Sequence, residues 1–182
     1  LHAEDVPVEA VAAAVGTPVY IYSSATLLRH YRLLDEALSG LPHLVCFAVK
    51  ALSNVAVLKL LGDQGAGMDV VSGGEYLRAR AAGVPGERIV FSGVAKTEDE
   101  IRLALEGGIR QFNVESEPEL ELLSALATKI GRVAPIALRV NPDVDAHTHA
   151  KIATGRKEDK FGIPVARAAA VADRARALPG VQ

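Results

Sequence analysis

The run Leu44–Lys50 constrains the fold of this chain more than any other feature of its sequence. It reads LVCFAVK, apolar up to a final lysine, and a helical pattern through Val55 and Leu58 follows it closely. An apolar run of this length next to a helix is typical of a strand buried on both faces of a parallel sheet. Lys50 would then lie at the carboxyl end of a strand, the end at which barrels and open α/β sheets place their active sites.

Lys50 is the first candidate for a reactive group. We expect apolar neighbours to lower the pKa of its amine, because burial disfavours the charged form. A neutral amine is a nucleophile and forms a Schiff base with a carbonyl compound. The alternative is a lysine whose stem lies along the strand end while its ammonium stays in solvent, and spacing alone favours that alternative.

Helices and strands alternate along the rest of the chain. Helices are predicted over residues 6–14, 25–39, 53–61, 73–82, 97–106, 117–130 and 164–178, and strands over residues 19–22, 44–50, 67–70, 89–91, 111–114 and 135–140. Ser24 is a good N-cap residue for the second helix, and Ser72 for the fourth. Repeated strand–helix units of this kind indicate an α/β fold with a parallel sheet.

The length of 182 residues leaves two architectures open. A complete (β/α)8 barrel takes about 250 residues. The chain is therefore either a small open doubly wound sheet, complete as given, or a barrel cut short near Gly180–Gln182, where another strand is expected.

Composition argues against several classes of function. The formal net charge is −2, tryptophan is absent and aromatic residues make up only 4%, so we expect no nucleic-acid partner. No apolar stretch is long enough to span a membrane, and Leu1–Ala10 is acidic and unlike a signal peptide. The single cysteine, Cys46, cannot form an internal disulfide, which favours a reducing compartment, the cytoplasm.

The lysine run and four other motifs carry a resemblance to a known family. Phe47–Ala51 resembles the cofactor-lysine motif of the alanine racemase-like, fold-type III pyridoxal-phosphate decarboxylases, with Leu52 in place of the more usual asparagine. The other motifs extend the resemblance over nearly the whole chain, in the family's order, at residues 16–20, 67–75, 139–142 and 148–163.

The resemblance implies the N-terminal part of a (β/α)8 barrel that binds pyridoxal 5′-phosphate, with the family's C-terminal β domain absent from this chain. Residues 1–23 would form a helix and strand leading into the barrel, and residues 24–182 the partial barrel itself. The resemblance also implies a homodimer with active sites at the subunit interface. The phosphate anchor and the partner of the pyridine nitrogen would lie outside these residues, so we expect the isolated segment to be inactive.

The resemblance leaves three hypotheses for function. The first is decarboxylation of the amino acid meso-2,6-diaminopimelate to L-lysine and CO2, the last step of lysine biosynthesis. The second is decarboxylation of ornithine or arginine, and the third is a barrel that binds pyridoxal phosphate without catalysis. The motif Thr148–Ile163 favours the first hypothesis, and a long loop over the site argues against a simple cofactor carrier.

Five residues are candidates for the cofactor site. The resemblance gives Lys50 the covalent bond to the cofactor and places Ala48, Asp69, Glu75 and Arg139 near it. Residue types alone leave alternatives: a carboxylate such as Glu75 is favoured in the first turn of a helix by the helix dipole. Arg139 lies in an apolar run and needs an ion-pair partner if buried, for which Asp69 or Glu115 is suitable.

Three further patterns carry less weight. Asp143, Asp145, His147 and His149 could be interpreted as metal ligands, but their spacing fits no compact site and favours a solvated loop, so no metal is expected. We expect the polar loop over residues 143–158 to be a lid on the active site, as long loops often are. The glycines at 62, 65 and 67 lack the spacing of a dinucleotide-binding motif.

Overall fold

A parallel sheet of five strands forms the centre of the fold. The computed structural model describes residues 1–144 and 161–182. The strands lie side by side in chain order: β3 (Cys46–Ala48), β4 (Gly67–Val70), β5 (Ile89–Phe91), β6 (Gln111–Val114) and β7 (Ile136–Leu138). A doubly wound sheet reverses its strand order at a switch point. This sheet has no reversal, so the doubly wound alternative is wrong and the arrangement is that of a barrel segment.

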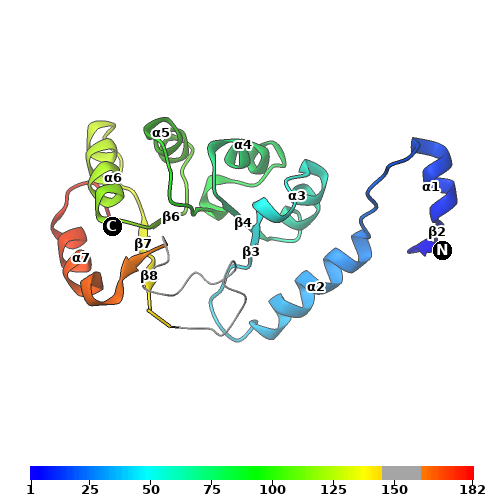
Figure 1. Ribbon diagram of the computed structural model, residues 1–182, viewed down its shortest axis with the longest axis horizontal. Helices are drawn as coiled ribbons and strands as arrows, with labels where there is room; N and C mark the ends of the chain where they lie inside the picture. The colour runs from blue at the N-terminus through cyan, green and yellow to red at the C-terminus, as the bar shows by residue number, and fades with distance from the viewer. Residues whose placement is uncertain (145–160) are drawn as a thin grey trace.

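Four helices cover one face of the sheet. They are α3 (Val55–Gly62), α4 (Gly73–Ala81), α5 (Glu98–Glu106) and α6 (Glu117–Lys129), and Figure 1 shows them in chain order along one side of the strands. Helices on a single face, each between two neighbouring parallel strands, are the outer ring of a (β/α)8 barrel. No helix in residues 1–144 and 161–182 has both the length and the apolar character needed to cross a membrane.

The hydrophobic core lies between the sheet and these helices. Successive strand residues point to opposite faces, and those that face the helices are apolar. Phe91 and Phe112 are neighbours in register on β5 and β6, both fully buried, with ring centroids 6.0 Å apart. The other face of the same strands carries polar residues, among them Asp69 on β4 and Asn113 on β6.

Side-chain caps begin the helices that follow the strands. Asn54, Ser72, Thr97 and Ser116 each accept a hydrogen bond from a backbone N–H in the first turn of α3, α4, α5 and α6. Thr97 also forms a capping box with Glu100. Each cap satisfies donors that the helix itself leaves unpaired. The predicted cap at Ser72 is confirmed.

The N-terminal elements extend away from the sheet, as Figure 1 shows. They are the antiparallel pair β1 (His2–Ala3) and β2 (Val6–Pro7), then α1 (Val8–Val15) and α2 (Ser24–Ala37). Glu4 Oε1 accepts a hydrogen bond of 2.8 Å from the N–H of Ala25, which joins the hairpin to the start of α2. Ser23 is the N-cap residue of α2, so the predicted cap at Ser24 is wrong by one position.

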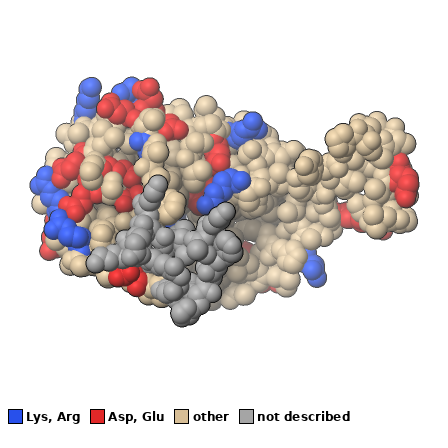
Figure 2. Space-filling model, viewed as in Figure 1, with Lys and Arg blue, Asp and Glu red and all other residues tan. Residues whose placement is uncertain are grey.

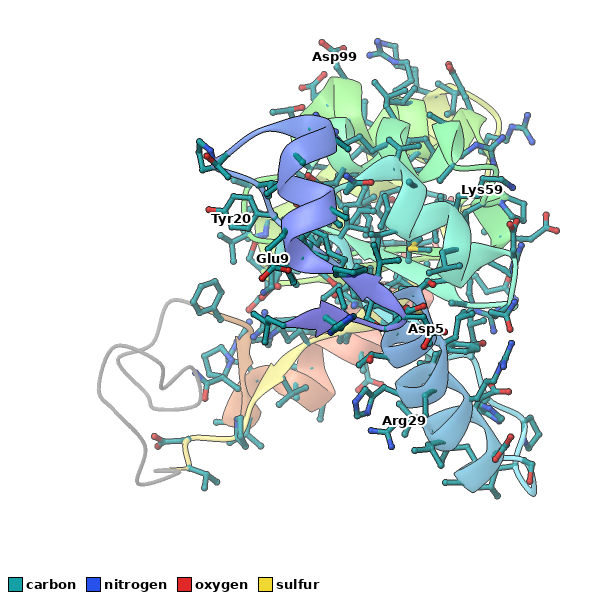
Figure 3. All side chains as sticks on the ribbon, turned by 90° about the vertical axis from the view of Figure 1, so that its right-hand side faces the viewer. Asp5, Glu9, Tyr20, Arg29, Lys59 and Asp99 are labelled. Carbon is teal, nitrogen blue, oxygen red and sulfur yellow. The ribbon has the colours of Figure 1, made fainter. Side chains whose placement is uncertain are left out.

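The strand predicted over residues 19–22 is also wrong. The segment forms no strand, and its side chains are exposed, with Tyr20 at 86% of its maximal accessible surface. Figure 3 shows the Tyr20 side chain projecting from the ribbon. The N-terminal part of the chain, which extends to the right in Figure 2, carries few charged side chains on the face seen there. An isolated strand is not stable without a neighbour to satisfy its backbone groups. Among the described residues no such neighbour lies beside it.

The predicted strand over residues 44–50 is shorter than expected. Only Cys46–Ala48 forms β3, and a 3₁₀ turn, η1 (Val49–Ala51), follows it. The strand is half-buried rather than buried on both faces, because it is the first of the five. Burial raises the pKa of the Cys46 thiol, which keeps the sulfur protonated and unreactive.

The last elements continue the barrel pattern. The predicted strand over residues 135–140 is divided into β7 and β8 (Val140–Asn141), and β8 pairs in parallel with β9 (Ile163–Pro164), just before α7 (Val165–Ala177). Residues 180–182 run parallel to the start of β7, with Val181 opposite Ala134. The N–H of Ile136 donates to the carbonyl of Gln182 at 2.8 Å. This pairing is where the sequence predicts a further strand.

Candidate active site

A cavity of about 750 Å³ opens at the carboxyl ends of β3 to β7. Its polar lining comes from all five strand ends: Lys50, Asp69, Ser92, Asn113, Glu115 and Arg139. Apolar side chains such as Val71 and Leu138 complete the walls. The carboxyl end is the face at which barrels of this type hold their active sites. Three of the residues predicted from the sequence, Lys50, Asp69 and Arg139, therefore meet in one cavity.

Lys50 lies in the turn η1 immediately after β3 and lines the cavity. Its neighbour Val49 is fully buried, whereas Lys50 itself is exposed. The enclosure by apolar side chains expected from the sequence is therefore not found among the described residues. Neither a hydrogen bond nor an ion pair engages the Lys50 amine within residues 1–144 and 161–182. The amine is thus available to a ligand in the cavity.

Lys96 is the buried lysine of this region, and its amine is fully engaged. Its side chain has no accessible surface, and Nζ donates to the carbonyls of Gly93 at 2.7 Å and Asn113 at 2.8 Å. A third hydrogen bond, of 2.6 Å, goes to Glu119 Oε1. An ammonium has three donors, and here all three are used. Lys96 therefore cannot compete with Lys50 as a nucleophile, while Lys151 and Lys160 lie outside the described residues.

Asp69 is held by a neighbouring strand end. Ser92, the residue directly after β5, donates its hydroxyl hydrogen to Asp69 Oδ1 over 2.5 Å. Ala48 is the register partner of Asp69 in the pairing of β3 with β4. Ala48 therefore lies beside the site at the end of its strand, although it is not among the residues that line the cavity.

Glu75 is placed differently from the prediction. Its carboxylate accepts a hydrogen bond of 2.8 Å from the N–H of Val71, and its own N–H donates to Ser72 Oγ at 3.2 Å. It is not among the residues that line the cavity. The structure therefore corresponds to the alternative in which this carboxylate stabilises the first turn of α4. A contact of Glu75 with the cofactor stays a prediction.

Arg139 forms an ion pair with Glu115 rather than with Asp69. Arg139 Nη1 lies 2.7 Å from Glu115 Oε1, and the guanidinium carbon is 5.1 Å from the centre of the Phe161 ring. The Glu115 side chain is only 2% exposed, and within the described part of the chain its other oxygen, Oε2, has no hydrogen-bond partner. The pair neutralises a buried carboxylate and leaves the guanidinium, whose side chain is 41% exposed, open to the cavity.

Sequence reasoning missed Ser92 and Asn113 as site residues. Each is a single small polar residue at the end of a short strand, β5 or β6. The signal that could have found them is their position, because every residue at the carboxyl end of a barrel strand is a candidate. Asp145, His147, His149 and the predicted lid lie outside the described residues, apart from the lid's first two positions. In residues 1–144 and 161–182 no group of His, Cys, Asp or Glu suited to a metal is found.

The fold and the cavity together define a barrel domain that can bind a carbonyl compound through a lysine amine. Residues 24–182 match the family described as pyridoxal-dependent decarboxylase, pyridoxal binding domain. The chain belongs to this family, which confirms the resemblance seen in the sequence.

Named relatives refine this assignment. The chain is 52% identical over 182 residues to a diaminopimelate decarboxylase from Haemophilus influenzae and 54% identical over 183 residues to one from Pseudomonas fluorescens. Both alignments cover all of this chain and 44% of the relative. A solved structure of diaminopimelate decarboxylase from Helicobacter pylori complexed with L-lysine covers 97% of this chain and 45% of its own, with 39% identity and a TM-score of 0.93. The chain thus spans under half the length of these relatives.

The residues of the cavity fit pyridoxal phosphate. The cofactor has an aldehyde, for which Lys50 provides an unengaged amine, and anionic oxygens, for which Arg139 provides a cation. Val71 and Leu138 provide apolar surface beside these polar groups. Lys50, Asp69 and Arg139 are the residues of this chain that would hold the cofactor.

Proposed function

We propose that the protein containing this chain converts meso-2,6-diaminopimelate to L-lysine and CO2 with the help of pyridoxal phosphate. The observation that carries the proposal is that the Lys50 amine, in a cavity shared with Asp69 and Arg139, binds no other group of residues 1–144 and 161–182. The identity of 52% and 54% to relatives named diaminopimelate decarboxylase supports this substrate over ornithine or arginine.

Each cavity residue has a role that follows from its chemistry. Lys50 would hold the cofactor through its amine, which is the nucleophile of the cavity toward an aldehyde. Pyridoxal phosphate, when bound, supplies a ring that accepts the electron pair left when CO2 departs. Arg139, kept in place by Glu115, puts a positive charge beside anionic groups of the bound molecules. Asp69 accepts hydrogen bonds from their N–H or O–H groups.

Borohydride reduction tests the role of Lys50. The complete natural protein that contains this sequence is loaded with pyridoxal phosphate, reduced, digested and mapped by mass spectrometry. We expect the label on Lys50 and its loss in Lys50→Ala, while Lys59→Ala, which changes an exposed lysine of α3, keeps the label. A label on Lys96, Lys151 or Lys160 would overturn the assignment.

Product analysis tests the substrate. We expect CO2 and L-lysine from meso-2,6-diaminopimelate, and little CO2 from ornithine or arginine under the same conditions. Preferred release from ornithine or arginine would replace the first proposal by the second hypothesis. A reduced and labelled protein that releases CO2 from none of these amino acids would support a barrel that only binds cofactor.

We further infer a cytoplasmic homodimer in which residues 1–23 lead into the barrel domain of residues 24–182. The single cysteine supports the cytoplasm, and the separation of α1 from the sheet in Figure 1 supports the division of the chain. The homodimer is supported by the family resemblance. Sedimentation velocity of the complete protein tests it, and a monomer at micromolar concentration would contradict it.

A further inference from the structure

Four side chains form a continuous chain of hydrogen bonds across three neighbouring strands. Gln111 Nε2 donates to Asn113 Oδ1 at 2.8 Å, Asn113 Nδ2 donates to Ser92 Oγ at 2.9 Å, and Ser92 Oγ donates to Asp69 Oδ1 at 2.5 Å. We call these four residues the strand-end chain. Register brings them together, because Asp69 pairs with Val90 and Val90 pairs with Gln111.

The carboxylate dictates the direction of every hydrogen bond in the strand-end chain. An ionised aspartate only accepts hydrogen bonds, so the Ser92 hydroxyl must donate to it. Because the single hydrogen of the Ser92 hydroxyl is donated to Asp69, the Ser92 oxygen must accept a hydrogen bond from the amide nitrogen of Asn113. The amide oxygen of Asn113 then faces Gln111 and accepts in turn. A single orientation of each side-chain amide satisfies all the hydrogen bonds of the strand-end chain, which ends at Asp69.

The strand-end chain fixes one oxygen of Asp69, and no other described residue binds the second oxygen. Oδ1 is occupied by Ser92, while Oδ2 makes no hydrogen bond within the described part of the protein. The terminal torsion of an aspartate is broad when nothing holds it. A short hydrogen bond to Oδ1 selects one value of that torsion, and Oδ2 is the oxygen left for a ligand in the cavity.

The place of these residues argues against a role in stability alone. The stabilising core lies on the other face of the sheet, against the helices, where Phe91 and Phe112 are buried. Asp69, Ser92 and Asn113 instead line the cavity at the carboxyl ends. Side-chain amides do not conduct protons at neutral pH, and the donation from Asn113 Nδ2 to Ser92 Oγ fits an orienting role.

We propose that Ser92 and Asn113 are positioning residues that orient Asp69 so that Oδ2 accepts a hydrogen bond from an N–H group of the bound cofactor or substrate. The identity of that ligand rests on the proposed function, whereas the orientation of Asp69 does not. Displacement of a reacting group by about an ångström can cost on the order of a hundredfold in rate. Loss of the Ser92 hydroxyl is therefore expected to reduce turnover by about tenfold to a hundredfold.

Three variants of the complete natural protein test the proposal. Ser92→Ala removes the donor, Ser92→Thr keeps it, and Ser124→Ala is the matched control. Ser124 is a buried serine of α6 whose hydroxyl donates to the carbonyl of Pro179 at 2.6 Å, away from the cavity. For each variant the dissociation constant of pyridoxal phosphate is measured by absorbance titration, together with kcat and KM.

We expect Ser92→Ala to weaken cofactor binding and lower kcat, Ser92→Thr to restore both, and Ser124→Ala to change neither. Asn113→Ala should change both in the same direction as Ser92→Ala but less, because Asn113 acts through Ser92. Unchanged cofactor binding and kcat in Ser92→Ala, or an equal loss in Ser124→Ala, would overturn the proposal.

A crystal structure of cofactor-free Ser92→Ala tests the same idea without any activity. The Asp69 carboxylate should be rotated or present in two conformers. An Asp69 side chain in its original place would overturn the positioning role whatever the substrate is. Failure of the wild-type protein to bind pyridoxal phosphate would instead overturn the proposed function and leave this crystallographic result to decide the inference.

Discussion

Replacement of Lys96 by methionine measures how much the buried ion pair behind the cavity contributes to stability. Methionine has a similar length but no charge, so the change leaves Glu119 without its cation. It also leaves the carbonyls of Gly93 and Asn113 without the donor that joins them. Removal of one partner from a buried ion pair costs about 3–5 kcal/mol. The side chains of Lys96 and Glu119 are 0% and 9% exposed, so we expect the free energy of unfolding to fall within that range.

Urea unfolding of the complete natural protein, followed by circular dichroism and by fluorescence, gives this free energy if both signals show the same transition. Lys59→Met is the control, because the Lys59–Asp63 pair is exposed at 62% and 58%, and Figure 3 shows Lys59 at the surface. An exposed pair of this kind contributes about 0.3–0.5 kcal/mol.

The double variant Lys96→Met with Glu119→Gln separates the charge from the packing. Glutamine at position 119 removes the uncompensated negative charge. Its amide oxygen can still accept from the N–H of Glu115, which in the unchanged protein donates to Glu119 Oε2 at 3.1 Å. We expect the two changes together to cost less than the sum of the single changes, by about 1–3 kcal/mol. Additive costs, or a loss below about 1 kcal/mol for Lys96→Met, would refute the reasoning.

The remaining predictions concern Glu100 and two glycines. Burial alone would raise the pKa of Glu100, but hydrogen bonds from the N–H groups of Gly73 and Thr97 outweigh it and lower the pKa below its ordinary value of 4.5. Its contribution to stability is therefore complete above about pH 4.5 and is lost as the pH falls below it; Glu100→Gln should flatten this part of a melting-temperature profile, and an unchanged profile would contradict the assignment. Gly86→Ala should destabilise the protein by about 3 kcal/mol or more in urea unfolding, since its Cβ would overlap the backbone carbonyl of Gly107. Gly40→Ala, with open space around its Cβ, should change stability by about 1 kcal/mol or less, and equal effects of the two would be contrary to this prediction.

The sequence predicts the central part of the fold well for local reasons. The bounds of β4, β5 and β6 match the predicted strands to the residue, because each is a short run between helix signals and capping residues. The strand predicted over residues 19–22 failed because its apolar side chains carry no information on whether a partner strand lies beside it. The prediction of a strand over residues 44–50 buried on both faces was wrong in part for a similar reason, because the position of β3 in the sheet decides how much of the strand is buried.

The site shows the same division between local and long-range information. The positions of Lys50, Asp69 and Arg139 at strand ends could be predicted because each follows or ends an apolar run, whereas their grouping around one cofactor was implied only by the family resemblance. The strand-end chain could not, because the contact of Asn113 with Ser92 depends on the register of β5 against β6. The contact of Glu75 with the N–H of Val71 could not be predicted, because a carboxylate in a first helical turn has the same sequence pattern whether it faces a ligand or its own backbone.

The pairing of β8 with β9 has a consequence for the stretch of chain between these two strands and for the residues beside it. Val140 lies opposite Ile163, so the two ends of the intervening stretch of chain are fastened to each other by the backbone. The entropy of closing such a stretch rises slowly with its length, by about 0.6 kcal/mol for a doubling. A change in the length of chain between Val140 and Ile163 therefore alters the entropy of closure only slightly. Arg139 and Phe161, which line the cavity, stand next to these anchor points along the chain, so the pairing holds their backbones in place beside the sheet that carries Asp69.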